Sequence, residues 1–446
     1  MLRIKLGLLA SLLAWTVLGA QAADTDTLRV DLKRALEIAL SDNPTIKIAD
    51  KEIERVDYSQ KAAWGALLPA LSASAKYSHF AVAGKTIQFG SEIDVPTEFN
   101  FDASVSLSLP IVAPALWHAI KLSALDMQMA AEKARASKIT LRNDVTKSYY
   151  NLLLAQDSYE ALQDGYNIAK QNYELAKQRY ENGMAAEYDY ISAEVQMNNL
   201  LPNLLQVENG VRQSKLYLKV LMGVGAEVAL AAEGNLASLE AVVTGSAAGI
   251  SLRSNADLVQ LDIQQLQLQK SLQLQQSQRM PTLAGFGQYG YSGSQSKEMA
   301  LNFGGAPITI ESQPFKMLSS GLIVGVQLSV PIFNGFTKTY KEKQIKIQVK
   351  ELELQREYVE KTLTVQAQSS LDNMEKAVKQ MESNKKAVAL AEKGYKISGT
   401  RYNNGMGTML ELQSSALALT QSKLSYHQAI SDYLSAKADY EKIAGE

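Results

Sequence analysis

The chain has 446 residues, a formal net charge of −1, 46% hydrophobic residues and no cysteine. A chain without cysteine has no disulfide, no thiol nucleophile, no cysteine metal ligand and no cysteine-linked lipid. The balanced charge lacks the basic footprint of a nucleic-acid-binding protein, so no nucleic acid is expected as a partner.

Residues 1–22 are expected to be a secretory signal peptide. Arg3 and Lys5 give a positive start, residues 6–18 form an apolar run, and Ala20-Gln21-Ala22 fits a small-x-small cleavage site. The alternative, a membrane anchor, is disfavoured because the apolar run is too short to cross a bilayer. No run of 18 apolar residues follows, so the rest of the sequence predicts no membrane-spanning helix.

The rest of the chain is interpreted as one structural unit used twice, over residues 23–222 and 251–446. Matching motifs recur at offsets of 212 to 222 residues: Asn43-Pro44 with Asn255-Ala256, Pro69 with Pro281, Leu109-Pro110-Ile111 with Val330-Pro331-Ile332, and Arg179-Tyr180 with Arg401-Tyr402. Near-constant offsets over such a length indicate a structural repeat.

Each unit is predicted to contain a helix, a β-hairpin and a long helical hairpin. The expected ranges are 43–67, 69–112 and 115–222 in the first unit, and 255–279, 281–332 and 336–443 in the second. Proline disfavours a helical residue before it, so Pro69 and Pro281 are expected to end the first helix of each unit. Residues 223–250, between the units, are expected to be an irregular equatorial segment or a plain linker.

The hairpins carry the pattern of membrane strands. Residues 99–109 alternate between apolar side chains and small polar ones, and residues 70–82, 282–291 and 321–330 do so less regularly. In an outer membrane the apolar face meets lipid and the polar face a lumen. The alternative is a soluble β-subdomain, but its serine-rich face would have no second core. Loops over 84–97 and 296–317 are expected to join the strands.

Four strands per chain cannot close a barrel. An open edge in lipid leaves unpaired N–H and C=O groups, at several kcal/mol each. Two copies would give an eight-stranded barrel filled by side chains, and three copies give twelve strands, which leave an aqueous passage. A homotrimer in outer-membrane lipid is therefore predicted. Trp64 and Trp117 lie just outside the predicted strands and are expected at the membrane interface, although two such positions could be a coincidence.

The helical hairpins carry a coiled-coil pattern. Residues 115–180 contain no proline and only one glycine, Gly165, and their later part follows a heptad repeat. A helix of roughly 65 residues is on the order of 100 Å long. These patterns predict an α+β membrane protein: a trimeric 12-stranded β-barrel continued by a long α-helical coiled-coil barrel. The alternative is a non-channel coiled-coil structural protein of the cell envelope.

Nothing in the sequence forms a catalytic constellation. His79, His118 and His427 are far apart, and no glycine-rich phosphate loop follows a strand and opens a helix. No enzyme activity, cofactor or metal site is therefore predicted.

The most specific motif is Arg-Tyr-x-x-Gly at the end of each long helix, at 179–183 and 401–405. An acid follows each glycine six residues later, at Asp189 and Glu411. With these motifs the chain resembles the outer-membrane efflux protein family, the TolC-like channels, over essentially all of the sequence after residue 22. A plainer interpretation of Gly183 and Gly405, as left-handed helix C-caps, is compatible with this resemblance.

The resemblance implies a homotrimer in the outer membrane with a periplasmic helical tunnel closed at its far end. It implies a passive exit duct of a tripartite efflux or type I secretion system, docked to a periplasmic adaptor and an inner-membrane pump driven by protons or ATP. By motif position the adaptor-docking tips are Gly183, Met184, Ala185, Gly405, Met406 and Gly407, and the gate or constriction is Asp189, Tyr402 and Glu411. The alternative for Glu411 is a solvated acid at a helix N-terminus.

Two departures from the family pattern concern the gate. Gly407 stands where relatives have an arginine, and Ser414 stands where they have a second acid. We therefore hypothesise a gate held by packing and by tyrosine hydrogen bonds, such as Tyr402 to Asp189, rather than by salt bridges.

Overall fold

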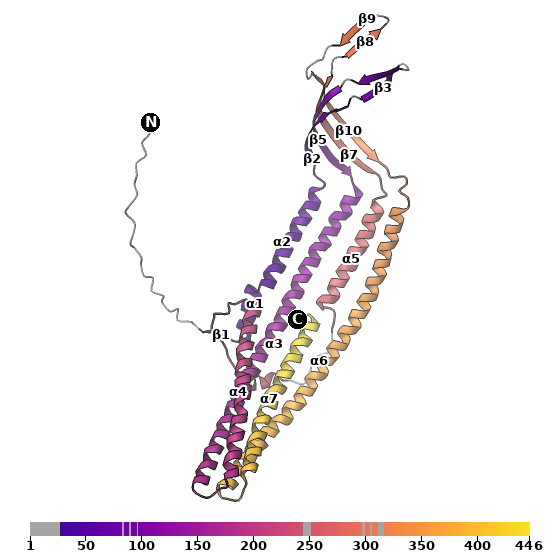
Figure 1. Cartoon of the computed structure of the whole chain (residues 1–446). Coiled ribbons are helices and arrows are strands. Elements are labelled where there is room, and N and C mark those ends of the chain that lie inside the picture. The colour runs from indigo at the N-terminus through magenta and orange to yellow at the C-terminus, as the bar shows by residue number, and fades with distance from the viewer. Residues whose placement is uncertain are drawn as a thin grey trace, which may run out of the picture. The chain divides into compact units, whose positions relative to one another are not determined.

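The computed structural model describes residues 27–446 except 83, 89–90, 96, 244–250, 297–298, 304–305 and 311–315 (Figure 1). The expected signal peptide, residues 1–22, lies outside the described residues. The chain divides into two compact units, and each takes segments from both halves of the sequence. The first unit comprises residues 1–47, 137–251 and 364–446, and the second comprises residues 48–136 and 252–363.

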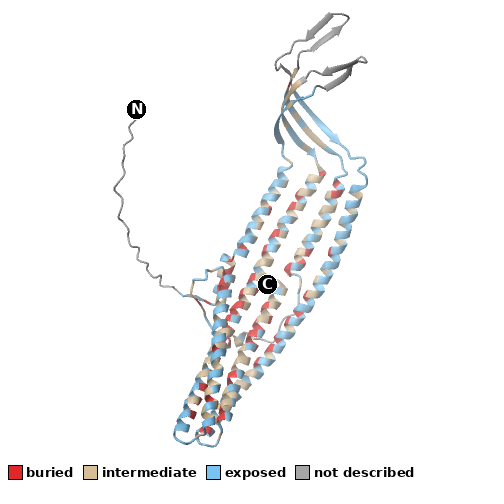
Figure 2. Cartoon of the chain, viewed as in Figure 1, coloured by how far each residue is buried: buried red, intermediate tan, exposed pale blue. Residues whose placement is uncertain are grey.

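The first unit is mainly helical. It contains β1 (Leu28–Val30), α1 (Leu32–Asp42), α4 (Glu187–Met222), β6 (Leu230–Ala232), η1 (Ala237–Val242), α7 (Met409–Ala444) and the later parts of α3 (Pro114–Glu181) and α6 (Thr337–Asn403). The two long helices agree with the heptad prediction. Buried residues recur along α3, α4 and α7 (Figure 2).

Equivalent asparagines start the helix that precedes each hairpin. The Asn43 side-chain oxygen accepts a hydrogen bond from the Thr45 backbone N–H at 2.7 Å, at the start of α2 (Pro44–Gly65). The Asn255 oxygen accepts from Asp257 and Leu258 at the start of α5 (Ala256–Ser277). Both side chains satisfy N–H groups that the first helical turn leaves unpaired. The repeat is therefore visible in the capping chemistry as well as in the motif offsets.

The segment that follows α4 packs into the core of the first unit. β6 pairs in parallel with β1, with Leu28 opposite Leu230. The largest fully buried side chains of this core come from α3, α4, α7 and the residue just before η1, and include Leu152, Leu153, Leu218, Met222, Leu236, Ile430, Tyr433 and Leu434. The described part of 223–250 is thus a packed strap and not a plain linker.

Polar contacts tie this strap, residues 230–243, to three helices. The Asp157 carboxylate of α3 accepts a hydrogen bond from the Leu236 N–H at 2.8 Å. The Glu240 carboxylate accepts from Lys385 of α6 at 2.7 Å and from the Tyr426 hydroxyl of α7 at 2.9 Å. The hydrogen bonds from Lys385 and Tyr426 hold the pKa of Glu240 below its ordinary value.

The second unit contains the antiparallel sheet. Its strands are β2 (Ala70–His79), β5 (Thr97–Val112), β7 (Thr282–Ser296) and β10 (Lys316–Ser329), in the order β10-β7-β5-β2 (Figure 1). These are the four predicted amphipathic strands. In the described part of the chain β2 and β10 each have one neighbour in this sheet, so both outer edges are open.

The register separates an apolar face from a serine face. Leu71 lies opposite Leu107, whereas Ser72 lies opposite Ser106. Ser106 is also opposite Gln288 in β7. Because successive side chains of a strand point to opposite faces, the alternation read from one strand extends across its neighbours.

The prediction of loops over 84–97 and 296–317 was wrong. The first contains a hairpin of β3 (Gly84–Gln88) and β4 (Ser91–Val95), and the second a hairpin of β8 (Met299–Phe303) and β9 (Ala306–Ile310). The glycines of these segments predict turns, but the segments also contain β-branched residues such as Ile87, Ile93 and Ile308, which favour strands.

Ion pairs and hydrogen bonds join the helices of the second unit. Arg356 of α6 pairs with Asp262 of α5 at 2.7 Å, and Arg279 pairs with Glu342 at 2.8 Å. Trp64 of α2 and Trp117 of α3 belong to this unit and are 57% and 46% exposed. None of the helices in the described residues combines the length and the hydropathy that crossing a bilayer requires.

Candidate functional site

The two Arg-Tyr-x-x-Gly motifs form matching turns in the first unit, one joining α3 to α4 and the other joining α6 to α7. Gly183 and Gly405 have φ of 70° and 71°, in the left-handed region. The Met184 N–H donates to the Arg179 carbonyl at 2.7 Å, and the Met406 N–H donates to the Arg401 carbonyl at 2.8 Å. This is the Schellman pattern, in which a left-handed glycine closes the last helical turn. The C-cap interpretation of both glycines is confirmed.

Gly407 lies where the second turn is crowded. A Cβ at this position would lie 3.1 Å from Cβ of Arg401 and 3.2 Å from the backbone nitrogen of Tyr402. The turn therefore folds back onto the end of α6 more tightly than a residue with a side chain would allow without movement.

The two motif arginines make different contacts. The Arg179 guanidinium donates to the carbonyl oxygens of Tyr402 and Asn403 at 2.7 and 2.5 Å. Its central carbon also lies 4.6 Å from the centroid of the Tyr402 ring. Arg401 instead donates to the Met406 carbonyl at 3.2 Å and lies 3.5 Å from the Glu411 carboxylate, both within its own hairpin.

Tyr402 is buried between the two hairpins, with 4% of its surface exposed. It belongs to a small cluster with Ala176 of α3, Ala193 of α4, and Met409 and Leu412 of α7. Burial raises the pKa of its hydroxyl, and the nearby Arg179 guanidinium opposes this rise. Within the described residues the hydroxyl has no partner in hydrogen-bond geometry. The hypothesised hydrogen bond from Tyr402 to Asp189 is therefore absent from the described residues, although the Asp189 carboxylate is near enough to contribute to the raised pKa of the hydroxyl.

The two acids of the predicted constriction lie in the first turns of equivalent helices. Asp189 is in the first turn of α4 and Glu411 in the first turn of α7. The Thr408 side chain caps α7 by accepting from the Glu411 N–H at 3.2 Å. A carboxylate at a helix N-terminus is stabilised by the helix dipole, so this local role applies to both acids.

The predicted docking residues differ in the exposure of their side chains. Met184 and Met406 are 69% and 65% exposed, whereas the side chain of Ala185 is half-buried. Arg179 is part of the motif, but no functional role was predicted for it from the sequence. Its position in the last turn of α3, a place where cations meet helix carbonyls, was the available signal.

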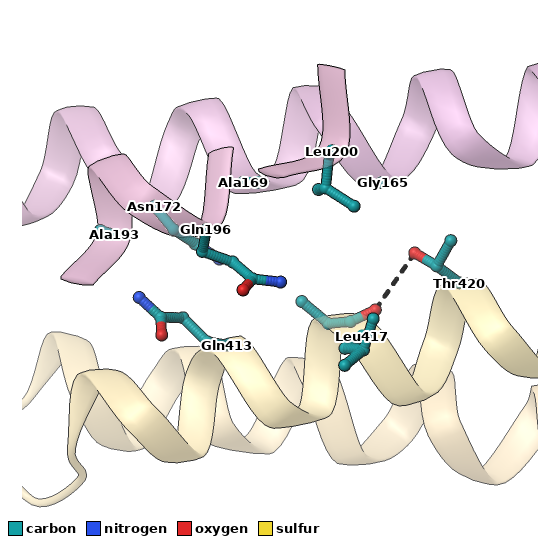
Figure 3. A pocket seen from close by; sticks show the side chains of 10 residues that line it. Gly165, Ala169, Asn172, Ala193, Gln196, Leu200, Gln413, Leu417 and Thr420 are labelled. Carbon is teal, nitrogen blue, oxygen red and sulfur yellow. Dashed lines mark hydrogen bonds between the residues drawn. The ribbon is translucent and has the colours of Figure 1, made fainter. Parts of the chain in front are cut away.

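A small cavity lies between α3, α4 and α7, farther along the helices (Figure 3). Its volume is about 20 Å³ and its lining includes Asn172, Gln196 and Gln413. The carboxamides of Gln196 and Gln413 point into the space between the helices (Figure 3). A Cβ at Gly165 would lie 2.7 Å from Oγ1 of Thr420, so α3 and α7 approach closely beside it. This volume admits a water molecule but not an exported compound.

Comparison with known proteins places this architecture in a family. A sequence profile of the outer membrane efflux protein family matches residues 35–224 and 248–446. The chain therefore belongs to the outer membrane efflux protein family, whose members are outer-membrane channels and not enzymes. The two matched ranges correspond to two copies of the family's unit.

Solved structures share the fold at low sequence identity. The outer membrane channel CmeC of Campylobacter jejuni is 15% identical, with a TM-score of 0.74 over 93% of this chain and 85% of that one. The outer membrane protein VceC of Vibrio cholerae is 14% identical, with a TM-score of 0.73 over 93% and 96%. The open state of the MtrE channel of Neisseria gonorrhoeae is 14% identical, with a TM-score of 0.70 over 93% and 88%. No curated protein sequence matches the chain.

Proposed function

We propose that the chain is a subunit of a passive outer-membrane exit duct, which a periplasmic adaptor joins to an inner-membrane pump. One observation carries this proposal: a sheet with an apolar face, a serine face and two open edges, β2 and β10. An apolar face with open edges is stable in lipid only when other strands complete the hydrogen bonding. Small molecules and proteins are both compatible cargoes, and the pump can be driven by protons or by ATP.

A homotrimer completes the sheet most economically. Each copy would place its β2 edge against the β10 edge of the next copy, so the strands form one closed cylinder. Twelve strands leave an aqueous passage, whereas eight strands form a barrel that side chains fill. In the trimer the serine face lines the passage, and the apolar face meets outer-membrane lipid.

The exposed tryptophans fit the membrane interface. Trp64 and Trp117 flank the sheet in sequence and expose much of their rings. Indole rings favour the boundary between lipid and water because they are amphipathic. The helical first unit would then lie in the periplasm.

The helical tips are proposed to hold both the adaptor-docking surface and the gate. Met184 and Met406 are exposed, flexible apolar side chains suited to a protein partner, and they flank Gly183, Ala185, Gly405 and Gly407. Asp189 and Glu411 would each occur three times around the axis of a trimer. Such rings of carboxylates concentrate negative potential and favour cations.

Extraction from outer membranes followed by conductance measurements tests the proposal. The protein should require detergent, migrate as a trimer and produce discrete conductance steps in planar lipid bilayers. A water-soluble monomer without conductance would overturn it. That result would favour the second candidate, a coiled-coil structural protein of the envelope, which the long helices α3 and α6 alone would fit.

A further inference from the structure

Arg179 and Arg401 hold equivalent positions in the repeat, yet only Arg179 joins the two halves of the chain. Its guanidinium contacts residues 223 and 224 positions away, at the end of α6. Arg401 contacts Met406 and Glu411, which lie within ten residues of it along the chain. A motif that is symmetric in sequence is therefore asymmetric in its contacts.

The contacts of Arg179 suit a cation at a helix end. The last carbonyls of a helix lack partners within the helix and carry the negative end of its dipole. The Tyr402 and Asn403 carbonyls are the last two of α6, and the planar guanidinium reaches both. The same group lies over the Tyr402 ring, at a distance typical of a cation–π interaction.

The partner of Arg179 is itself held in place. Tyr402 packs against Ala176 of α3 and Ala193 of α4, two small residues that let its ring sit between the hairpins. Gly407 lies close to Arg401 and Tyr402, so the second turn is folded tightly against the same backbone. Arg179 therefore contacts a tightly packed helix end and not a loosely packed loop.

We propose that Arg179 is the latch of the tip: it holds the α3–α4 hairpin to the end of α6 within one chain and keeps the duct closed. This inference rests on the proposed function as an exit duct. It assigns the closing contact to carbonyl groups and an aromatic ring, not to a carboxylate. The latch should therefore resist salt, which screens exposed ion pairs but has little effect on such contacts.

The test compares Arg179→Gln with Arg401→Gln in the full-length protein. Each change removes one guanidinium from an equivalent turn, but only the first removes contacts between the hairpins. Arg179→Gln should raise the open probability in planar bilayers on the order of tenfold, the factor that corresponds to about 1.4 kcal/mol. Arg401→Gln should leave it near the wild-type value, because the contacts of Arg401 stay within its own hairpin.

A distance measurement provides a second readout that does not depend on conductance. The natural chain has no cysteine, so spin labels can be placed at Asn182→Cys and Asn404→Cys in the two tips. Labelled subunits are diluted with unlabelled ones, so that distances within one chain dominate. The distance distribution should broaden toward longer values in Arg179→Gln, but not in Arg401→Gln.

Three outcomes separate the latch from the duct. A wild-type protein without conductance would overturn the proposed function. A conducting wild type with equal open probabilities and equal tip distances in both arginine variants would overturn the latch alone. Opening of the wild type between about 0.1 and 1 M salt would also overturn it, since a carboxylate lock would then account for closure.

Discussion

Single residues at the tips show what a left-handed glycine contributes. A Cβ at Gly183 or Gly405 would meet no atom within 4 Å, so steric contact does not explain the glycines. Their φ of about 70° does, because an L-residue in the left-handed region costs roughly 1–2 kcal/mol. Gly183→Ala and Gly405→Ala should each lower the unfolding free energy by about that amount, as judged from thermal unfolding followed by circular dichroism.

Gly394 provides the matched control for this prediction. It lies inside α6, where a Cβ would also meet nothing within 4 Å, but its φ is helical. Gly394→Ala should therefore stabilise the protein by about 0.5–1 kcal/mol. Similar Tm shifts for all three variants would show that the backbone conformation of the tips does not matter.

Residue identity predicted the turns better than it predicted their contacts. The spacing from Arg179 to Gly183 was enough to expect a C-cap, because the bonds of that motif are local. The contact from Arg179 to Tyr402 was not predictable, because the sequence contains the same Arg-Tyr pair twice and does not distinguish them. The Tyr402–Asp189 hydrogen bond was expected from motif position, but in the described residues the Tyr402 hydroxyl has no hydrogen-bond partner.

At the scale of elements, local periodicity predicted the regular segments well. The alternation over 99–109 corresponds to β5, and the heptads correspond to α3 and α6. The structure of the strap could not be predicted from the sequence because it depends on distant partners. β6 pairs with β1, and Leu236 is buried against other helices. The short hairpins β3–β4 and β8–β9 were not predicted, because the glycines of these segments are typical of loops whereas their β-branched residues favour strands.

The strap offers a prediction about pH. The pKa of Glu240 is depressed by Lys385 and Tyr426, so its contribution to stability is present above the pKa of an unfolded Glu, about 4.3. The contribution is lost as the pH falls through the lower pKa of the folded state. Glu240→Gln should therefore have a lower Tm than the wild type at pH 7, and the difference should shrink as the pH falls below about 4.

An ion pair that lies within a single helix is the control for the Glu240 prediction. Glu375 pairs with Lys379 four residues later in α6, so the pair joins no second segment. Glu375→Gln should change the Tm little at either pH, as exposed pairs within a helix contribute little. If Glu240→Gln behaves in the same way, its contacts with α6 and α7 do not stabilise the strap.

At the scale of the whole molecule, the faces of the sheet decide between a duct and a soluble protein. Leu107 and Ser106 are neighbours in β5, an inner strand of the sheet, and their side chains belong to opposite faces. In a lipid-embedded barrel, Leu107→Arg would place a charge against hydrocarbon, at about 2–4 kcal/mol near the bilayer midplane. It should lower the amount of trimer recovered from outer membranes.

Ser106→Arg is the matched change on the other face. In the proposed barrel this face lines a water-filled passage, so the arginine remains hydrated and the trimer should assemble normally. Three added positive charges around the passage should reduce its conductance for cations, because like charge raises the barrier to their entry. In a soluble β-subdomain, Leu107→Arg could still impair folding, but Ser106→Arg would have no current to alter. A normal trimer whose cation conductance is unchanged by Ser106→Arg would therefore mean that the serine face does not line the passage.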